Sequence, residues 1–176
     1  MNFLRRRPKL PAPLRPALDR DERVLAWAYA GPEAGGPVVV ATTRGLWLPD
    51  RPRLGWHEIH RAAWSGSALQ VTPAEVAEER SGYTVLVDAP VLSFPLPEPG
   101  ELPDQVRTRV TRSVAYTTHY PMPVGGVRVV GRRVPGADGL SWAVRYDSGT
   151  PVDMEQVVRL TDEVVASARE ATAPPE

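Results

Sequence analysis

The chain has 176 residues, a formal net charge of zero and no cysteine, and charged residues make up 24% of it. This length suits one compact domain, or one domain with an appendage. The lack of cysteine excludes disulfides, thiolate metal sites and a cysteine nucleophile. A neutral body argues against a dedicated nucleic-acid binder, and no apolar run approaches the ~20 residues that a membrane-spanning helix needs. The composition therefore predicts a folded cytoplasmic protein.

Residues 1–20 have the composition of a tail. Prolines recur every two or three residues from Pro8 to Pro16, which favours an extended backbone and forbids a helix. Six cations face one acidic residue, Asp19, in this stretch. We therefore expect residues 1–20 to form a basic, proline-rich, disordered tail.

The pattern changes to short strands after residue 20. Apolar, β-branched and aromatic residues form runs that are separated by Gly- and Pro-rich turns. The expected strands are 24–29, 38–42, 46–48, 54–56, 59–64, 68–72, 83–88 and 91–96. Short strands at this near-regular spacing predict an antiparallel meander that closes into a barrel or sandwich.

A helical period follows the strands. Leu102, Val106, Val110 and Val114 lie four residues apart, which predicts one amphipathic helix that continues until the prolines at 121 and 123. The apolar stripe of this helix should lie on the sheet and cap one open end of the barrel.

The last third predicts two more strands and a helix, a ββα unit. Strands are expected at 127–134 and 140–147, on either side of a turn at 135–139. Asp153 and Gln156 have the spacing of a capping box at the start of the final helix. We divide the chain into a tail (1–20), a barrel with its helix (21–120) and a ββα extension (121–171). The extension is too small to stand alone, so it should dock on the barrel or on a second copy of the chain in a homo-oligomer.

One stretch resembles a known family. Residues 56–64, which begin with Trp56 and end with Trp64, are followed by Gly66, Leu69 and Val71. This pattern is similar to the middle strands of bacterial pleckstrin-homology-like (PH-like) domains. The resemblance covers about residues 21–118 and implies an antiparallel β-barrel or sandwich capped by one helix. The whole chain also looks like a group of uncharacterised proteins from GC-rich bacteria.

The resemblance also bears on ligands. Family members that bind phosphoinositides carry Lys and Arg in the first strand-to-strand loop, whereas residues 31–37 here carry only the acidic Glu33. Phosphoinositide binding is therefore not expected. The other common use of the family is to hold a protein or peptide, which makes an unknown protein the expected partner. Fold-level analogy sets no mechanism, and no cofactor is expected.

His57 and His60, with Glu58 between them, are the candidate metal ligands. If the segment is a strand, His57 and His60 point to opposite faces, which separates the imidazoles. The zincin helix also needs two residues between its Glu and its second His, and here there is one. We favour structural histidines, and a metal-dependent enzyme is the least favoured of three functions.

Arg128, Arg132 and Arg145 are the candidate phosphate-binding residues. Arg128 and Arg132 share one face of their strand, and Arg145 lies on the partner strand nearby. With the basic tail they could bind nucleic acid or a phosphoryl ligand, which is our alternative function. No aromatic residues interleave with them as a single-strand platform requires, and an ordinary solvated sheet face explains them as well.

Trp56 and Trp64 are the candidate protein-binding residues. Most of the five tryptophans should pack in the core, but two exposed together would mark a partner surface. Our leading interpretation is a non-enzymatic protein-interaction or scaffold module of PH-like fold.

Overall fold

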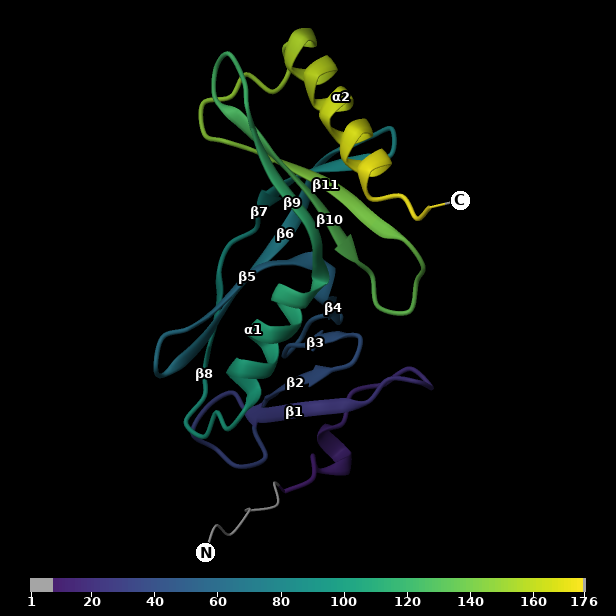
Figure 1. Cartoon of the computed structure of the whole chain (residues 1–176). Coiled ribbons are helices and arrows are strands. Elements are labelled where there is room, and N and C mark those ends of the chain that lie inside the picture. Colours follow the sequence, from purple (N-terminus) through teal and green to yellow (C-terminus); the bar gives the residue numbers. More distant parts are fainter. Residues whose placement is uncertain (1–7, 176) are drawn as a thin grey trace, which may run out of the picture.

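The computed structural model describes residues 8–175 and has an α+β fold, as predicted (Figure 1). Two α-helices, α1 (Leu102–Ser113) and α2 (Glu155–Ala171), accompany the short 3₁₀ helices η1 (Ala12–Leu14) and η2 (Trp56–Glu58). The strands are β1 (Val24–Tyr29), β2 (Val38–Thr42), β3 (Gly45–Trp47), β4 (Leu54–Gly55), β5 (Ile59–Trp64), β6 (Ala68–Arg80), β7 (Tyr83–Asp88), β8 (Leu92–Pro95), β9 (Val114–Pro121), β10 (Gly126–Arg133) and β11 (Leu140–Tyr146).

The strands form two sheets. The first is antiparallel, with the order β1-β2-β3-β4. The second is a curled half-barrel with the order β5-β6-β7-β11-β10-β9, and β8 pairs with β6. Every pairing is antiparallel except that of β7 with β11. The prediction of a barrel or sandwich is consistent with this arrangement.

Strand β6 links two hydrophobic cores. Its first half pairs with β5 and β8, and its second half, from Ala74 to Arg80, pairs with β7. We expected this strand to end at residue 72. Pro73 and the run of Glu and Ala after it are residues that disfavour a strand. Pairing with β7 overrides that local preference.

Helix α1 covers the first core. Leu102 and Val106 are fully buried and Val110 nearly so, against apolar residues of β1, β2, β3, β5 and β6. The predicted stripe is therefore confirmed for Leu102, Val106 and Val110, but Val114 lies outside the helix and the predicted end of the helix is wrong. The helix ends at Ser113, and residues 114–121 form β9, whose burial alternates residue by residue. Its β-branched and aromatic residues favour the strand.

Helix α2 covers the second core. Val165 and Ala168 pack with Val129, Val144 and Trp142 of the half-barrel. The expected capping box is wrong: the N-cap is Met154, which follows Asp153, and no side chain caps the helix.

The predicted ββα extension shares its sheet with the preceding part of the chain. Strand β10 pairs with β9, and β11 pairs with β7, so strands from both sides of residue 120 form one sheet. The boundary at residue 120 stays a prediction, but no sheet edge separates the two parts there.

The predicted disordered tail lies partly outside the described residues, because residues 1–7 are not described. Residues 8–20 contact the body of the protein. The indole Nε1 of Trp27 donates to the Pro8 carbonyl at 3.1 Å, and Asp19 forms an ion pair with Arg53 at 3.0 Å.

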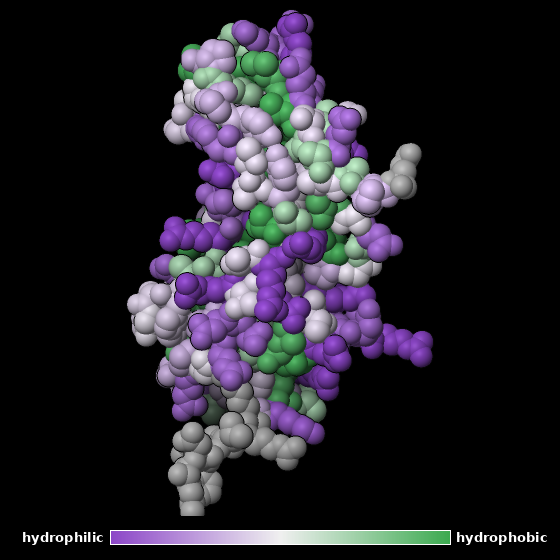
Figure 2. Space-filling view, in the orientation of Figure 1, coloured by the Kyte–Doolittle hydropathy of each residue, from purple (hydrophilic) through white to green (hydrophobic). Residues whose placement is uncertain are grey.

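The surface carries few large apolar side chains. On the face shown in Figure 2, hydrophilic residues dominate and hydrophobic residues form small separate areas. Among residues 8–175, no helix is both long enough and apolar enough to span a membrane.

Candidate functional site

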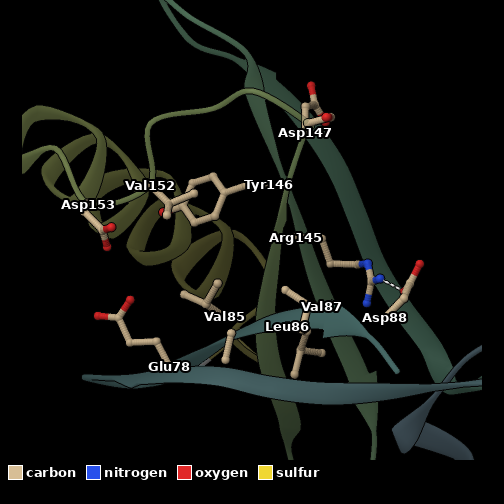
Figure 3. Close-up of a pocket in the computed structure, with 12 residues that line it drawn as sticks. Glu78, Val85, Leu86, Val87, Asp88, Arg145, Tyr146, Asp147, Val152 and Asp153 are labelled. Atoms are coloured by element: carbon tan, nitrogen blue, oxygen red, sulfur yellow. Dashed lines mark hydrogen bonds and ion pairs between the residues drawn. The ribbon is translucent and has the colours of Figure 1, made fainter. Parts of the chain in front are cut away.

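A cleft lies where β7 and β11 separate (Figure 3). The parallel pairing of these strands covers only Thr84 with Ala143 and Val85 with Val144. Both strands continue for two or three residues beyond this point while remaining paired to their other neighbours, β6 and β10. We call the resulting opening the β7–β11 cleft.

The cleft has a volume of about 500 Å³. Strands β6, β7 and β11 and the loop before α2 line it: Ala77, Glu78, Val85, Leu86, Val87, Asp88, Arg145, Tyr146, Asp147, Ser148, Val152 and Asp153. Val87 is 45% exposed, so its side chain presents apolar surface within the cleft. The walls therefore offer apolar surface to a ligand.

Backbone groups also point into the cleft. The amide of Ala89 donates to Pro73 on β6, and successive residues of a strand direct their backbone groups to opposite sides. Leu86 and Asp88 must therefore direct theirs toward β11. The amide of Asp147 donates to Gly126 by β10, so Tyr146 directs its backbone groups toward β7. The Leu86 N–H completes the Val85–Val144 bridge, so the groups left open between the walls are the Leu86 carbonyl and the backbone groups of Asp88 and Tyr146.

The lining of the cleft is acidic. Four carboxylates and one guanidinium line it. Asp88 pairs with Arg145, Asp147 with His119 at 2.7 Å, and Glu78 with Arg80 at 3.0 Å. Asp153 makes no ion pair within the described part of the chain. The excess of negative charge favours a cationic ligand.

A polar network fixes one wall of the cleft to α2. The hydroxyl of Tyr83 donates to Asp162 of α2 at 2.5 Å, and the Tyr146 and Thr161 hydroxyls are hydrogen-bonded at 2.6 Å. The Arg80 guanidinium donates to Tyr146 at 2.7 Å and lies beside both tyrosine rings. Burial, together with the Asp162 hydrogen bond, raises the pKa of Tyr83 to about 12. The wall is therefore held rigidly in place.

Burial alone lowers the pKa of Arg80. Hydrogen bonds with Glu78, Tyr83 and Tyr146 more than reverse this effect, and the pKa of Arg80 lies above its ordinary value. The guanidinium therefore stays charged and keeps Glu78 at the mouth of the cleft.

The structure brings Arg128 and Arg145 together but gives the three candidate arginines different roles. Arg128 and Arg145 are direct partners across β10 and β11, and Arg128 is exposed. Arg145 is paired with Asp88, and Arg132 donates to the carbonyl of Ile59 at 2.9 Å and to Ser113 at 2.9 Å. Arg132 and Arg145 thus serve internal contacts, which leaves Arg128 as the open cation of the three.

The two candidate tryptophans are not exposed together. Trp56 is 2% exposed, and its indole donates to the Thr42 carbonyl at 3.0 Å. A surface role for Trp56 is therefore wrong, because the first core encloses it. Trp64 is half-buried against the same core.

The two candidate histidines lie closer than predicted. We expected them on opposite faces of one strand, but His57 belongs to η2 and only His60 to β5, and both line a cavity of about 20 Å³ with Arg132 and Arg145. Burial and the charges of Arg145, Arg132 and Arg61 lower the pKa of His60 to about 4. Within residues 8–175, no three His, Asp or Glu side chains are grouped so that they could hold a metal ion.

The cleft had no local signal in the sequence. Its walls come from segments that are distant in the sequence: Asp88 on one wall and Arg145 on the other are 57 positions apart. The strands themselves are predictable, but the point at which two strands separate depends on the whole sheet.

Comparison with protein-family models, curated proteins and solved structures finds no match to this chain.

Proposed function

We propose that the chain is a non-enzymatic protein-interaction module of PH-like type, and that its β7–β11 cleft binds an extended, cationic segment of a partner protein. The observation that carries the proposal is the early end of the β7–β11 pairing. It leaves two facing strand edges beside exposed apolar side chains.

The order of elements supports the PH-like part of this proposal. A meander of strands in two sheets is followed by α1, and this helix packs on the first core across β1, β2 and β5. The expected resemblance implies the same order.

Backbone geometry supports an extended ligand. A peptide strand that enters a sheet gains hydrogen bonds from the exposed edge, while alternate side chains contact the walls. The Leu86 carbonyl and the backbone groups of Asp88 and Tyr146 face the cleft, and the Val87 and Val152 side chains supply apolar contact.

Charge supports a basic ligand. Carboxylates outnumber cations in the lining, and Asp153 is left without an ion-pair partner in the described chain. A ligand with Lys or Arg at alternate positions would complement these groups and gain attraction that falls as salt is added.

The first experiment uses a defined probe. A fluorescein-labelled peptide with the sequence Thr-Val-Arg-Val-Arg-Val-Thr, blocked at both ends, is titrated with the full-length protein and followed by fluorescence polarisation. We expect saturable binding that weakens with salt, and amide chemical-shift changes at Leu86, Asp88 and Tyr146. A version with Glu in place of Arg should bind at least tenfold more weakly.

Two exposed valines give a matched pair of variants. Val87 lines the cleft and is 45% exposed, whereas Val76 is 51% exposed on β6 and does not line it. Val87→Arg should abolish binding of the probe by blocking and repelling it, and Val76→Arg should leave binding unchanged. Equal effects of the two substitutions would overturn the proposal. Amide chemical-shift changes confined to residues around Arg128 would overturn it as well.

A further inference from the structure

A second interaction surface lies at the end of the half-barrel, on strand β9. In the sheet order, β9 has a neighbour on one side only, β10. Its eight residues, Val114–Pro121, include no Asp, Glu, Lys or Arg. Soluble proteins commonly protect an edge strand with charges or cover it, because an open edge can pair with another strand. An eight-residue edge without charge is therefore a candidate for pairing.

The alternation of hydrogen bonds along β9 shows which of its backbone groups point away from β10. The Met122 amide donates to Gly125 at the turn, and the Asp147 amide donates to Gly126. These two bonds place Tyr116, Thr118 and Tyr120 in the bonded positions toward β10. Their neighbours Thr117 and His119 therefore direct N–H and C=O groups away from the sheet, while a β-bulge interrupts the alternation at Ala115.

Thr117 can serve as the centre of a self-complementary register. When two β9 strands run antiparallel about a two-fold axis at Thr117, that residue meets its own copy and Ala115 meets His119. Thr117 then forms a hydrogen-bonded pair with its own copy, and His119 lies opposite the bulged Ala115. Pro121, which has no N–H to donate, falls outside these pairs. Cross-strand Thr–Thr pairs are favourable, and no like charges meet within the paired strands.

Strand β1 provides a contrast. It is also an edge strand, in the first sheet, and its residues are uncharged as well. However, α1 packs beside it, and the Trp27 side chain is hydrogen-bonded to Pro8 in the segment that carries η1 (Figure 1). That edge is covered by the chain itself, as edge strands commonly are.

We propose that two copies of this chain associate through antiparallel β9–β9 pairing, with the two-fold axis at Thr117. The pairing joins the half-barrels into one continuous sheet. A single pair of strands is a small interface beside the standard ~1,600 Å², so we expect a weak dimer. The proposal is independent of the ligand of the β7–β11 cleft.

Sedimentation equilibrium over a range of protein concentrations tests the association. The wild-type mass should rise from that of one chain toward twice that value as the concentration increases. Thr117→Lys places like charges opposite each other at the axis and should weaken association by about tenfold or more. The control is Thr108→Lys, on the exposed face of α1, which should leave association unchanged. Circular dichroism checks that both variants are folded.

A cysteine at the axis tests the register, because the natural chain has no cysteine. Thr117→Cys should give a cross-linked dimer in high yield with a short bismaleimide, whereas Ala34→Cys, in an exposed loop, should give little. A wild-type protein that stays monomeric at high concentration would overturn the proposal. A dimer that Thr117→Lys does not weaken and that Thr117→Cys does not cross-link would overturn it as well.

Discussion

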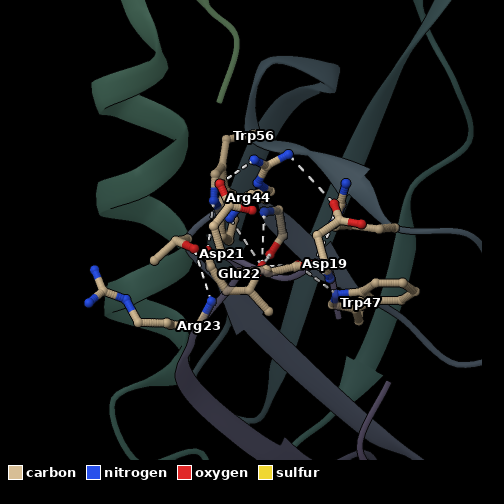
Figure 4. A network of polar contacts seen from close by, with 11 residues as sticks. Asp19, Asp21, Glu22, Arg23, Arg44, Trp47 and Trp56 are labelled. Carbon is tan, nitrogen blue, oxygen red and sulfur yellow. Dashed lines mark hydrogen bonds and ion pairs between the residues drawn. The ribbon is translucent and has the colours of Figure 1, made fainter. Parts of the chain in front are cut away.

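Glu22 and Arg53 form an ion pair at 2.5 Å that anchors the segment before β1 to the loop before β4. Figure 4 shows Glu22 within the surrounding network of polar contacts. The Glu22 side chain is fully buried, and it also accepts hydrogen bonds from Thr42 at 2.5 Å and Trp47 at 3.0 Å. Burial alone raises the pKa of this carboxyl. The hydrogen bonds from Thr42, the Asp19 backbone and Trp47, with the charge of Arg53, outweigh that effect and lower it. The carboxylate is therefore charged, enclosed and fully partnered.

Glu22→Ala should be strongly destabilising. Removal of the carboxylate leaves the Trp47 indole N–H without its acceptor, whereas Arg53 keeps Asp19 and the Thr42 hydroxyl keeps the Gly45 carbonyl. The loss should therefore reach at most the ~3–5 kcal/mol that breaking a buried ion pair costs. Urea unfolding measures the change in the free energy of unfolding. Asp21→Ala is the control: Asp21 is exposed and paired with Arg44, so we expect a much smaller change. Equal losses for the two variants would contradict the role given to Glu22.

Tyr83→Phe should reduce stability by about 1–2 kcal/mol, because it removes the hydrogen bond to Asp162 that joins α2 to the sheet. Thermal unfolding measures the change, and Tyr29→Phe, on β1, should have little effect. The raised pKa of Tyr83 offers a second measurement. In an ultraviolet titration of the folded protein, Tyr83 should ionise near pH 12, above the ordinary tyrosine value of ~10.

Stability should fall as the pH is lowered from about 6.5 toward 4. The pKa of His60 is about 4 in the folded state and ~6.5 in an unfolded chain, so the unfolded state binds the proton first. This contribution to stability is fully present above pH 6.5 and is lost as the pH approaches 4. Arg132 and Arg145 line the same cavity as His60, while Asp88 lies 3.9 Å from its ring.

Carboxylates also titrate in this range, so the test is a comparison. The wild type and His60→Gln are unfolded with urea at pH 7.5, 6, 5 and 4.5. The variant should lose less stability than the wild type across these values. Parallel losses in the two proteins would show that His60 keeps an ordinary pKa.

Arg132→Ala should cost about 1–3 kcal/mol in the free energy of unfolding. Arg132 joins β10 to the first core through its hydrogen bonds to Ile59 and Ser113, and its removal leaves a buried carbonyl without a donor. Arg128→Ala, on the same strand and face, should change stability little because Arg128 is exposed. If Arg128→Ala were the more damaging of the two, the internal role of Arg132 would be wrong.

The same pair bears on the alternative nucleic-acid function. Binding of a single-stranded oligonucleotide, if present, should depend on Arg128 and weaken steeply with salt. Fluorescence anisotropy with a labelled oligonucleotide, at two salt concentrations, measures it.

The local pattern by itself determined most of the elements. The stripe of Leu102, Val106 and Val110 gave the position of α1, and the strands near 24–29, 38–42 and 59–64 lie where their apolar runs predict them. These features depend on neighbours in sequence, which is why periodicity and turn residues reveal them.

Only the tertiary structure decided the rest. Pairing with β7 extends β6 through Pro73, and η2 turns His57 out of the β5 register and toward the cavity that His60 also lines. The roles of Arg132 and Arg145 depend on partners far away in sequence, Ile59 and Asp88. The point where β7 and β11 separate likewise arises from contacts between distant segments. Such contacts leave no periodic signal in the sequence. Their net contribution to the free energy of folding depends on the packing of the whole chain.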